Sequence, residues 1–331
     1  MVDLMRAVGY RNSLPVSDPS SLLDLQLPVP EPGEHDLLVR VRAVSVNPVD
    51  VKVRAGNDPQ GEPKILGYDA AGVVERVGPA VTLFRPGDEV WYAGSIARPG
   101  TNAEFHLVDE RITGPKPATL DFAQAAALPL TTLTAWEALF DRLRLTADST
   151  GTLLVLGAAG GVGAIAVQLA RQLTDLEVIG TASRPESRQY VLDRGAHRVV
   201  DHHGDLAAAL PDGVDYVFST HSAGMMETFA QIVKPFGAVV AIDNAPDLNV
   251  SPLMSKSIAW HWELMFTRAL HDPASTAQHE ILRQAAELVD KGVLHTTMTT
   301  LIEKIDAAGL RRAHAAIEAG STIGKTVLAG F

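Results

Sequence analysis

Residues 158–163 have the composition of a turn that binds phosphate groups. Ala158, Gly160 and Gly163 stand at the three small-residue positions of the G-x-G-x-x-G fingerprint, with alanine in place of the first glycine. The fingerprint needs small residues because the backbone must come close to a pyrophosphate, at which the N–H groups of a helix N-terminus point. We predict a dinucleotide site here; the alternative is a close-packed turn that binds nothing. The predicted ligands are Ala158, Gly160, Gly161, Val162 and Gly163.

The residues after the next strand indicate which nicotinamide dinucleotide fits. Sites for NAD place Asp or Glu there to hold the ribose 2′-hydroxyl. This chain has Ser183 and Arg184 instead, with Arg188 one helical turn later and no acid before Glu186. A hydroxyl and guanidinium groups suit the 2′-phosphate of NADPH. We therefore expect NADPH as the cofactor, held by Ser183, Arg184 and Arg188; the alternative is that Arg184 is a solvated charge at a helix start.

These groups need a scaffold, and residues 152–243 have the pattern of alternating strands and helices. Such alternation implies right-handed crossovers and a doubly wound parallel sheet, which binds ligands at the carboxyl ends of its strands. Thr220 follows one strand and is a candidate cofactor ligand, and His221 beside it is a candidate proton donor. The expected strands cover residues 152–158, 176–182, 197–201, 214–219 and 237–243, and the expected helices cover 162–173, 185–194 and 224–234.

The rest of the chain has other residue patterns. Up to about residue 115, short runs of alternating apolar and polar residues are punctuated by Pro and Gly, which predicts an irregular β-barrel or sandwich. Residues 119–143 have a helical pattern that is interrupted at Pro129. Further helical patterns lie near residues 275–291 and 306–319, before a last strand at 325–328. A length of 331 residues suits about two domains.

The composition excludes several functions. With 28 basic and 39 acidic residues the net charge is −11, which argues against a nucleic-acid binder. The chain has no cysteine, so disulfides, thiolate nucleophiles and thiolate-based zinc sites are excluded. Residues 149–170 carry no charge, but their five glycines favour a strand, turn and helix over a membrane span. Residues 1–6 have an early acid and no apolar run, so we expect no signal peptide and a cytoplasmic location.

Five motifs occur in a fixed order along the chain: residues 44–50 (VSVNPVD), 67–74 (GYDAAGVV), 86–90 (PGDEV), 126–131 (AALPLT) and 158–163 (AAGGVG). In this order the chain resembles the medium-chain dehydrogenase/reductase superfamily over nearly its whole length. The resemblance points to its zinc-free quinone oxidoreductase branch, and there to a bacterial subgroup often labelled zinc-type or zinc-binding alcohol dehydrogenase-like. It implies an α/β fold, with an irregular GroES-like β-barrel catalytic domain at residues 1–127 and 294–331, and a Rossmann domain at 128–293.

Zinc enzymes of this superfamily hold the catalytic metal with a Cys, a His and a further Cys or acid. The corresponding positions here resemble Asn47, Tyr68 and Leu130, whose amide, phenol and alkyl groups do not bind zinc at neutral pH. Residues 93–104, where the structural zinc would lie, contain no thiol. The adjacent histidines at 202–203 are expected on a strand, where they would point to opposite faces. We therefore expect no bound metal.

Without a metal, hydrogen-bond donors must polarise the substrate oxygen. Asn47 and Tyr68 are the candidate catalytic donors; the alternatives are that Asn47 only makes a turn and that Tyr68 only packs. Asp50, three residues after Asn47, is expected to cap the following helix; the alternative is that it orients Asn47. By resemblance, Thr134 lies near the nicotinamide end of the cofactor and Lys325 lies near the cofactor, although Lys325 could also be a surface charge on a strand.

The predicted function is NADPH-dependent transfer of hydride to a quinone, an enone or a related activated carbonyl compound. The alternatives are a zinc-dependent alcohol dehydrogenase and an NADPH-binding protein without catalysis. The partners expected are a small-molecule substrate and, by resemblance, a second copy of the chain, with neither nucleic acid nor membrane. The aromatic segment 257–266 resembles the family's sheet-edge strand, which pairs across a dimer; the alternative is plain core.

Overall fold

The computed structural model describes residues 3–246 and 248–331. Residues 1–2, which begin the segment 1–6 in which we expect no signal peptide, lie outside the described residues. The chain divides into two compact units, Met1–Leu130 with Phe266–Phe331, and Thr131–Met265. Residues 266–293, expected in the nucleotide-binding domain, belong to the first unit. The reason is that helix α9 (Ala277–Asp290) packs against β8 (Thr113–Pro115) and the 3-10 turn Glu110–Ile112.

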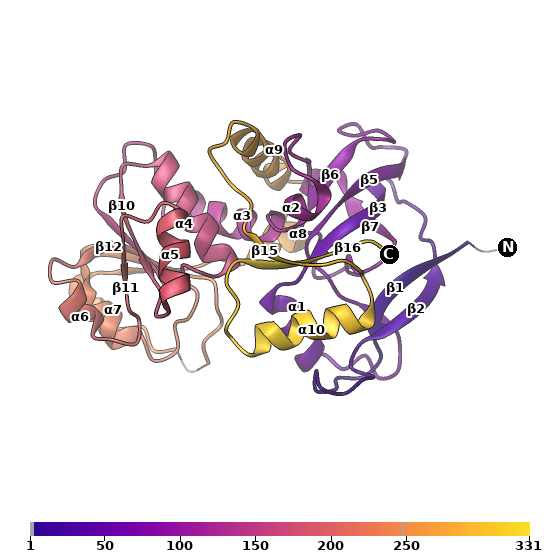
Figure 1. The fold of residues 1–331 in the computed structure, drawn as a ribbon. Helices are drawn as coiled ribbons and strands as arrows, with labels where there is room; N and C mark the ends of the chain where they lie inside the picture. Colours follow the sequence, from indigo (N-terminus) through magenta and orange to yellow (C-terminus); the bar gives the residue numbers. More distant parts are fainter. Residues whose placement is uncertain (1–2, 247) are drawn as a thin grey trace. The chain divides into compact units, whose positions relative to one another are not determined.

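The second unit contains a six-stranded parallel sheet in the order β11-β10-β9-β12-β13-β14. Figure 1 shows helices α4 and α5 on one side of this sheet and α6 and α7 on the other, as a doubly wound fold requires. The predicted fold class is therefore confirmed. The strands are β9 (Thr152–Val155), β10 (Glu177–Thr181), β11 (Arg198–Val200), β12 (Val214–Ser219), β13 (Val233–Ala241) and β14 (Ala259–Trp262), and the helices are α4 (Gly161–Leu173), α5 (Pro185–Asp193), α6 (Leu206–Ala209) and α7 (Met226–Ile232).

The strands β9 and β12 are parallel neighbours, and the chain adds further strands in opposite directions from them. Chain connections leave β9 towards β10 and β11 on one side, and leave β12 towards β13 and β14 on the other. Such a switch point opens a crevice at the carboxyl ends of the two strands, and ligands of doubly wound sheets bind there. The turn at residues 156–160 and the loop at residues 220–225 follow β9 and β12 directly, so both lie at this crevice.

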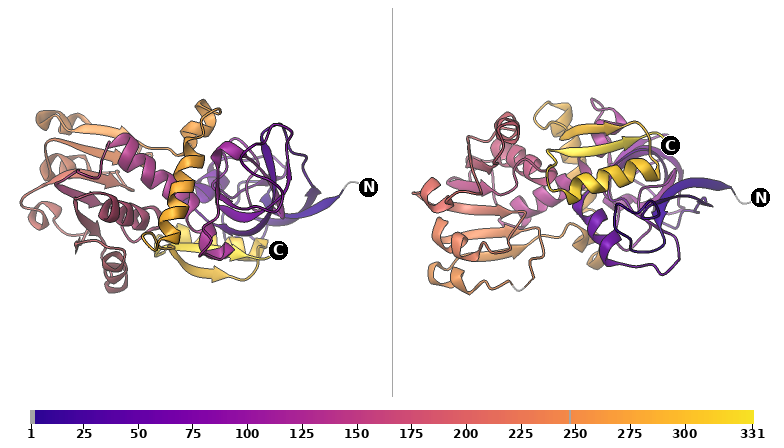
Figure 2. Two further views of the ribbon diagram at one scale, coloured as in Figure 1. Left: turned by 90° about the horizontal axis from the view of Figure 1, so that it is seen from above. Right: turned by 60° about the horizontal axis from the view of Figure 1, so that its bottom comes forward.

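The first unit is built on two sheets. A three-stranded sheet has the order β2-β1-β4, and a seven-stranded sheet has the order β15-β16-β3-β5-β6-β8, with β7 paired to β3. Both views of Figure 2 show the C-terminal β16 (yellow) returning to the N-terminal strands of the same unit. The remaining strands are β1 (Leu4–Tyr10), β2 (Leu23–Pro28), β3 (Asp36–Ser45), β4 (Lys64–Ile65), β5 (Ala70–Val77), β6 (Glu89–Tyr92), β7 (Phe105–Asp109), β15 (Met298–Ile302) and β16 (Lys325–Ala329).

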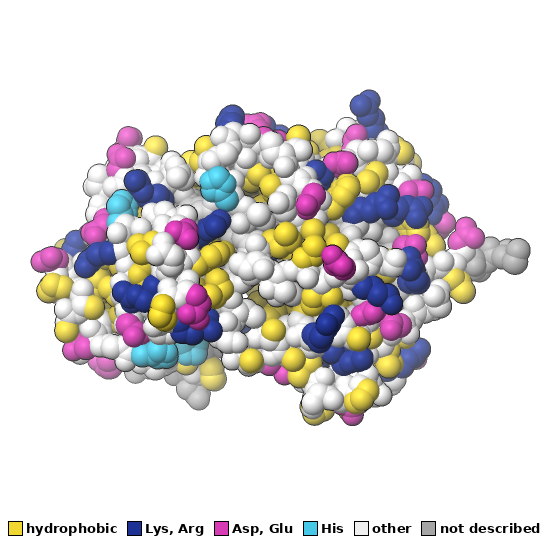
Figure 3. Space-filling model, in the orientation of Figure 1, with side chains coloured by type: hydrophobic (Ala, Val, Ile, Leu, Met, Phe, Trp, Pro, Cys, Tyr) yellow, Lys and Arg dark blue, Asp and Glu magenta, His cyan; other side chains and the backbone are white. Residues whose placement is uncertain are grey.

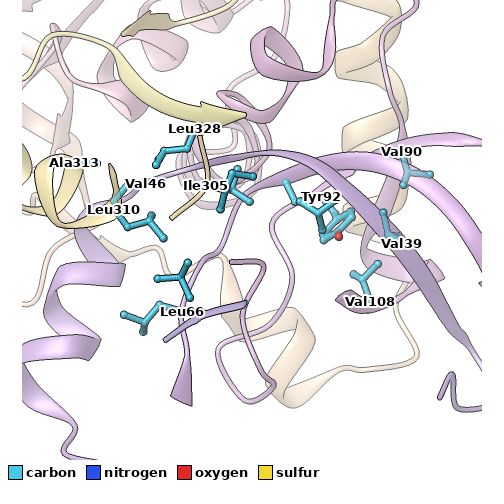
Figure 4. Close-up of a cluster of buried hydrophobic side chains, with 14 of the residues drawn as sticks. Val39, Val46, Leu66, Val90, Tyr92, Val108, Ile305, Leu310, Ala313 and Leu328 are labelled. Atoms are coloured by element: carbon cyan, nitrogen blue, oxygen red, sulfur yellow. The ribbon is translucent and has the colours of Figure 1, made fainter. Parts of the chain in front are cut away.

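The core of the first unit lies between the larger sheet and helix α10 (Ala307–Glu318). Figure 4 shows Leu310 and Ala313 of this helix gathered with Val46 and Leu328. All four side chains are buried, at 4% exposure or less, where α10 covers the ends of β3 and β16. The other helices of the unit are α1 (Pro48–Gly56), α2 (Phe122–Ala126) and α8 (Phe266–His271), while α3 (Pro129–Trp136) begins in the first unit and ends in the second.

The charged side chains and the uncharged segment can both be located in the structure. On the face seen in Figure 3, Lys and Arg side chains are interspersed with Asp and Glu. Residues 149–170 form β9, a turn and most of α4. Across the described parts of the chain, no helix combines the length and apolarity that crossing a membrane requires.

Candidate functional site

The glycine turn after β9 is shaped by Gly157 and Gly163. Gly157 has φ of +66°, and a Cβ on Gly163 would lie 2.3 Å from the carbonyl oxygen of Gly157. Ala158, placed by the sequence at the first glycine position, is fully buried, and Gly180 leaves room for its methyl group. A Cβ on Gly160 would meet only one atom, at 3.4 Å. The three small positions are therefore 157, 160 and 163, and the sequence reading missed Gly157.

Two threonine hydroxyls hold the peptide group between Leu156 and Gly157, at the start of this turn. Thr181, the last residue of β10, accepts a hydrogen bond from the N–H of Gly157 at 3.1 Å. Thr220, the predicted ligand after β12, donates to the carbonyl oxygen of Leu156 at 3.2 Å. The turn is thus tied to a neighbouring strand on each side. Thr181 was not predicted, since a threonine that ends a strand has no signature of its own in the sequence.

The residues present fit a dinucleotide. The first N–H groups of α4, from Gly161 to Gly163, have no acceptor within their own helix and attract phosphate oxygens. Glycine at 157, 160 and 163 lets the backbone approach, because side chains there would fill the turn or stand in front of it. The predicted residues of this turn therefore lie together at the crevice beside Thr220. Thr134 lies in α3, where it is buried, and His221 is exposed in the loop after β12.

The predicted phosphate ligands after β10 differ in exposure and in the hydrogen bonds that they already make. Arg188 donates to the carbonyl oxygens of Ala182 at 3.2 Å and Val199 at 3.0 Å, so part of its guanidinium joins β10 to β11. Arg184 precedes α5 with its side chain 43% exposed, and its Nε lies 3.4 Å from Glu186. Ser183 is half-buried beside it. Arg184 and Ser183 are therefore the better placed of the three for a 2′-phosphate.

In the first unit, Lys325 lies at the centre of a buried polar cluster. Its Nζ donates to Asn47 Oδ1 at 2.6 Å and to the carbonyl oxygen of Val46 at 2.7 Å, and lies 3.2 Å from Asp69 Oδ2. An ammonium group has three hydrogens, so these three acceptors use all of them. Burial lowers the pKa of Lys325, and the carboxylate of Asp69 opposes that shift. Lys325 and Asn47, predicted as separate cofactor and catalytic residues, are thus in direct contact.

Asn47 and Asp69 complete the cluster. Asn47 Nδ2 donates to Asp69 Oδ2 at 2.8 Å, while its contact with the carbonyl oxygen of Ser45 is long, at 3.4 Å. Asp69 Oδ1 accepts from the N–H of Leu130 at 2.8 Å. Burial raises the pKa of Asp69, and Lys325 counters this. Asn47 therefore has one N–H firmly held and one held only weakly.

Asp50 fixes the backbone beside Asn47. Its carboxyl accepts hydrogen bonds from the N–H of Asn47 at 2.6 Å and of Gly67 at 3.0 Å. The first bond is the reciprocal arm of a capping box at the start of α1, so the expected capping role is confirmed. Asp50 is fully buried, and desolvation raises its pKa from 3.8 to about 7, against the opposing effect of its hydrogen bonds.

This shift predicts a pH dependence of stability. Between pH 3.8 and about 7 the folded chain holds a proton on Asp50 that the unfolded chain releases. The contribution of Asp50 is therefore complete below pH 3.8 and is lost as pH rises through about 7. The free energy of unfolding should fall with pH by up to about 1.4 kcal/mol per pH unit for this one proton. Chemical denaturation at several pH values should show this component in the wild type and not in Asp50→Asn. A difference between the two proteins that does not vary with pH would contradict the assignment.

Tyr68 lies beside this cluster and is buried. Its ring meets that of Phe266 edge to face, with centroids 5.3 Å apart. Burial raises the pKa of its phenol, with Asp50 adding to the effect. The hydroxyl is therefore protonated at neutral pH and can donate a hydrogen bond.

The cluster around Asn47, where the sequence resemblance would place a catalytic zinc, does not fit that metal. The alkyl side chain of Leu130 has no ligand atom, and the oxygens of Asn47 and Asp69 already hold the Lys325 ammonium, whose charge repels a metal ion. Within residues 3–246 and 248–331, no three His, Asp or Glu side chains are grouped to hold a metal. One expectation was wrong: residues 202–203 form a turn rather than a strand, and their rings lie 4.2 Å apart.

Comparisons with known proteins agree with this architecture. The family pattern described as alcohol dehydrogenase GroES-like domain matches residues 33–118, and that described as zinc-binding dehydrogenase matches residues 194–328. The chain is similar to a zinc-type alcohol dehydrogenase-like protein of Staphylococcus epidermidis, with 38% identity over 98% of this chain and 99% of that protein. A Rhizobium etli structure, provisionally described as a zinc-dependent alcohol dehydrogenase, has 51% identity and a TM-score of 0.95, covering 100% of this chain and 99% of that one.

Two further relatives carry names that specify a reaction. An NADPH-dependent alkenal/one oxidoreductase of Arabidopsis thaliana is 36% identical, over 67% of this chain and 59% of that protein. A quinone oxidoreductase of Rattus norvegicus is 34% identical, over 68% of this chain and 69% of that protein.

Proposed function

Because the chain belongs to the medium-chain dehydrogenase/reductase superfamily and is therefore an oxidoreductase, we propose that it transfers hydride from NADPH to a quinone, an enone or a related activated carbonyl compound. The observation that carries the proposal is the Lys325 ammonium held by Asn47 and Asp69, where a metal-dependent enzyme would need open ligands. Acceptors that are already activated need no Lewis acid, which favours this substrate class.

The cofactor choice rests on the end of β10. When bound, NADPH supplies the hydride. Ser183 and Arg184 offer a hydroxyl and a guanidinium to its 2′-phosphate, and no acidic residue stands before Glu186 to hold a 2′-hydroxyl. The name of the Arabidopsis relative, which specifies NADPH and an alkenal or enone, supports the same choice.

Two side chains of the first unit are proposed to hold the substrate oxygen. The weakly held N–H of Asn47 and the protonated phenol of Tyr68 are the donors available beside the cluster. Donors fixed in advance stabilise negative charge as it develops on an oxygen. Lys325 and Asp69 keep the Asn47 amide in one orientation, so the cluster would act by positioning this donor.

Arg184→Ala tests the cofactor assignment. We expect the KM for NADPH to rise about tenfold, the loss typical of one charge-assisted hydrogen bond, while the KM for NADH stays unchanged. The rates are measured with both cofactors against a panel of quinones and enones. Arg198→Ala is the matched control, because its side chain is 48% exposed and lies at the opposite ends of the strands. An unchanged KM for NADPH, or a wild type that prefers NADH, would refute the NADPH assignment; no turnover with any acceptor would favour a non-catalytic NADPH-binding protein.

A metal measurement separates this proposal from a zinc-dependent alcohol dehydrogenase. We expect the purified protein to contain no stoichiometric zinc and to keep its full quinone or enone reductase rate after dialysis against a chelator. The reason is that the Asn47 and Asp69 oxygens already hold a cation, Lys325. One zinc per chain whose removal abolishes activity would establish the alternative.

The homodimer and the cytoplasmic location remain part of the proposal. Strand β14 forms one edge of the parallel sheet, and Trp262 on it is 59% exposed. An exposed edge strand with a large apolar side chain supports pairing with a second copy.

A further inference from the structure

A chain of three buried or half-buried side chains lies behind the cofactor crevice of the second unit. Asp243, two residues after β13, accepts hydrogen bonds from Ser222 twice: Oδ2 from its N–H at 2.7 Å and Oδ1 from its hydroxyl at 2.6 Å. The Ser222 hydroxyl also lies 2.9 Å from that of Ser219, the last residue of β12. None of these residues was predicted as part of the site.

The direction of these bonds follows from the donors available. A carboxylate can only accept, so the single hydrogen of the Ser222 hydroxyl points to Asp243. Ser219 must then donate to Ser222. Ser219 and Ser222 are 0% and 1% exposed, so breaking the chain would leave buried polar groups without partners. The loop after β12 is therefore anchored at Ser222, which both oxygens of one carboxylate hold, and Ser222 is in turn bonded to the end of β12 at Ser219.

Thr220 lies between the two anchored serines. It reaches across the switch point to the carbonyl oxygen of Leu156, and a Cβ on Gly157 would lie 2.2 Å from its hydroxyl oxygen. The position of Thr220 against the glycine turn is therefore set on one side by Gly157 and on the other by the bonds to Asp243.

We propose that Asp243 is a positioning residue of the cofactor site, acting through Ser222 on Thr220 and so on the shape of the crevice that takes the dinucleotide. This inference rests on the proposed function and deepens it. Asp243 is bonded to Ser222 and is proposed to act through it rather than by contacting the cofactor. Its role is to keep the loop after β12 closed against the turn after β9.

The test is a titration of the full-length protein with the dinucleotide. Binding is measured by the quenching of the protein's tryptophan fluorescence. Asp243→Ala should raise the Kd for NADPH about tenfold, raise KM likewise, and lower kcat at saturation by less than about threefold. Ser222→Ala keeps the backbone bond to Asp243 and should give a smaller rise. The matched control is Asn244→Ala, an exposed neighbour, which should leave Kd unchanged.

A double-mutant cycle distinguishes positioning from a merely structural role. If Asp243 acts through Thr220, Asp243→Ala combined with Thr220→Val should raise Kd little more than Thr220→Val alone. Independent, multiplying effects would overturn the proposal, as would an Asp243→Ala protein with unchanged Kd and only a lower melting temperature. Should Asp243→Ala fail to fold, Asp243→Asn and Ser222→Ala carry the same cycle. Each titration is repeated with NADH, so that a wild type preferring NADH refutes the cofactor choice without affecting the comparison.

Discussion

Replacing Lys325 with methionine is expected to lower the free energy of unfolding by about 3–5 kcal/mol, the cost of removing one partner of a buried ion pair. Methionine keeps much of the volume but leaves the Asp69 carboxylate and the Asn47 oxygen without their donor. The loss should shrink as pH falls, because protonation of Asp69 removes its uncompensated charge. Urea denaturation at acidic and neutral pH measures both effects.

The matched control is Lys304→Met, since the Lys304 side chain is 68% exposed and its contact with Asp306 is on the surface. That variant should change stability by less than about 0.5 kcal/mol. The outcome that contradicts our account is a Lys325→Met protein of normal stability with a raised KM for NADPH. That result would make Lys325 a cofactor ligand, as the sequence resemblance implies.

Gly163→Ala is expected to weaken NADPH binding about 100-fold, equivalent to about 2.7 kcal/mol. The new Cβ would lie 2.3 Å from the carbonyl oxygen of Gly157 and 2.7 Å from the Cα of Ala158, and both are backbone atoms that cannot rotate away. The turn must therefore open, which displaces the N–H groups that would face the pyrophosphate. Fluorescence titration and a melting curve report binding and stability together.

Two other glycines make this result specific. Gly160→Ala should leave the melting temperature nearly unchanged, since its Cβ would meet one atom at 3.4 Å, but should weaken NADPH binding by standing where the pyrophosphate approaches. Gly56→Ala, with no atom within 4 Å of the new Cβ, should change neither. Binding by Gly163→Ala within threefold of the wild type would show that the turn is not the dinucleotide site.

Local patterns in the sequence were sufficient for the fold class and for much of the second unit. The strand before residue 156 and the helix after residue 160 follow from an apolar run, a cluster of glycines and a helical run in succession. The interruption at Pro129 also appears, as the first residue of α3, because proline is compatible with the first turn of a helix. Each of these features is encoded within about ten consecutive residues, so sequence alone could predict it.

The boundaries of the units and the role of α9 were less accessible. The sequence gives α9 a clear amphipathic pattern, but that pattern does not say which sheet the apolar face will cover. Its packing against β8, far earlier in the chain, assigns residues 266–293 to the first unit. The turn at residues 202–203 was misread for a related reason: the end of a strand depends on where its partner strand ends.

By itself, the sequence determined the chemical inventory: glycines at a strand–helix turn, no cysteine, Ser183 and Arg184 with no acid before Glu186, and Asn47 in a motif that resembles the family's. Only the tertiary structure decided how that inventory is used. It brings Lys325, predicted as a cofactor ligand, within 2.6 Å of Asn47, a contact between residues 278 positions apart, inside a buried polar cluster. Such contacts arise from the pairing of β16 with β3 and leave no local trace, because burial and hydrogen bonding depend on the partners that folding supplies.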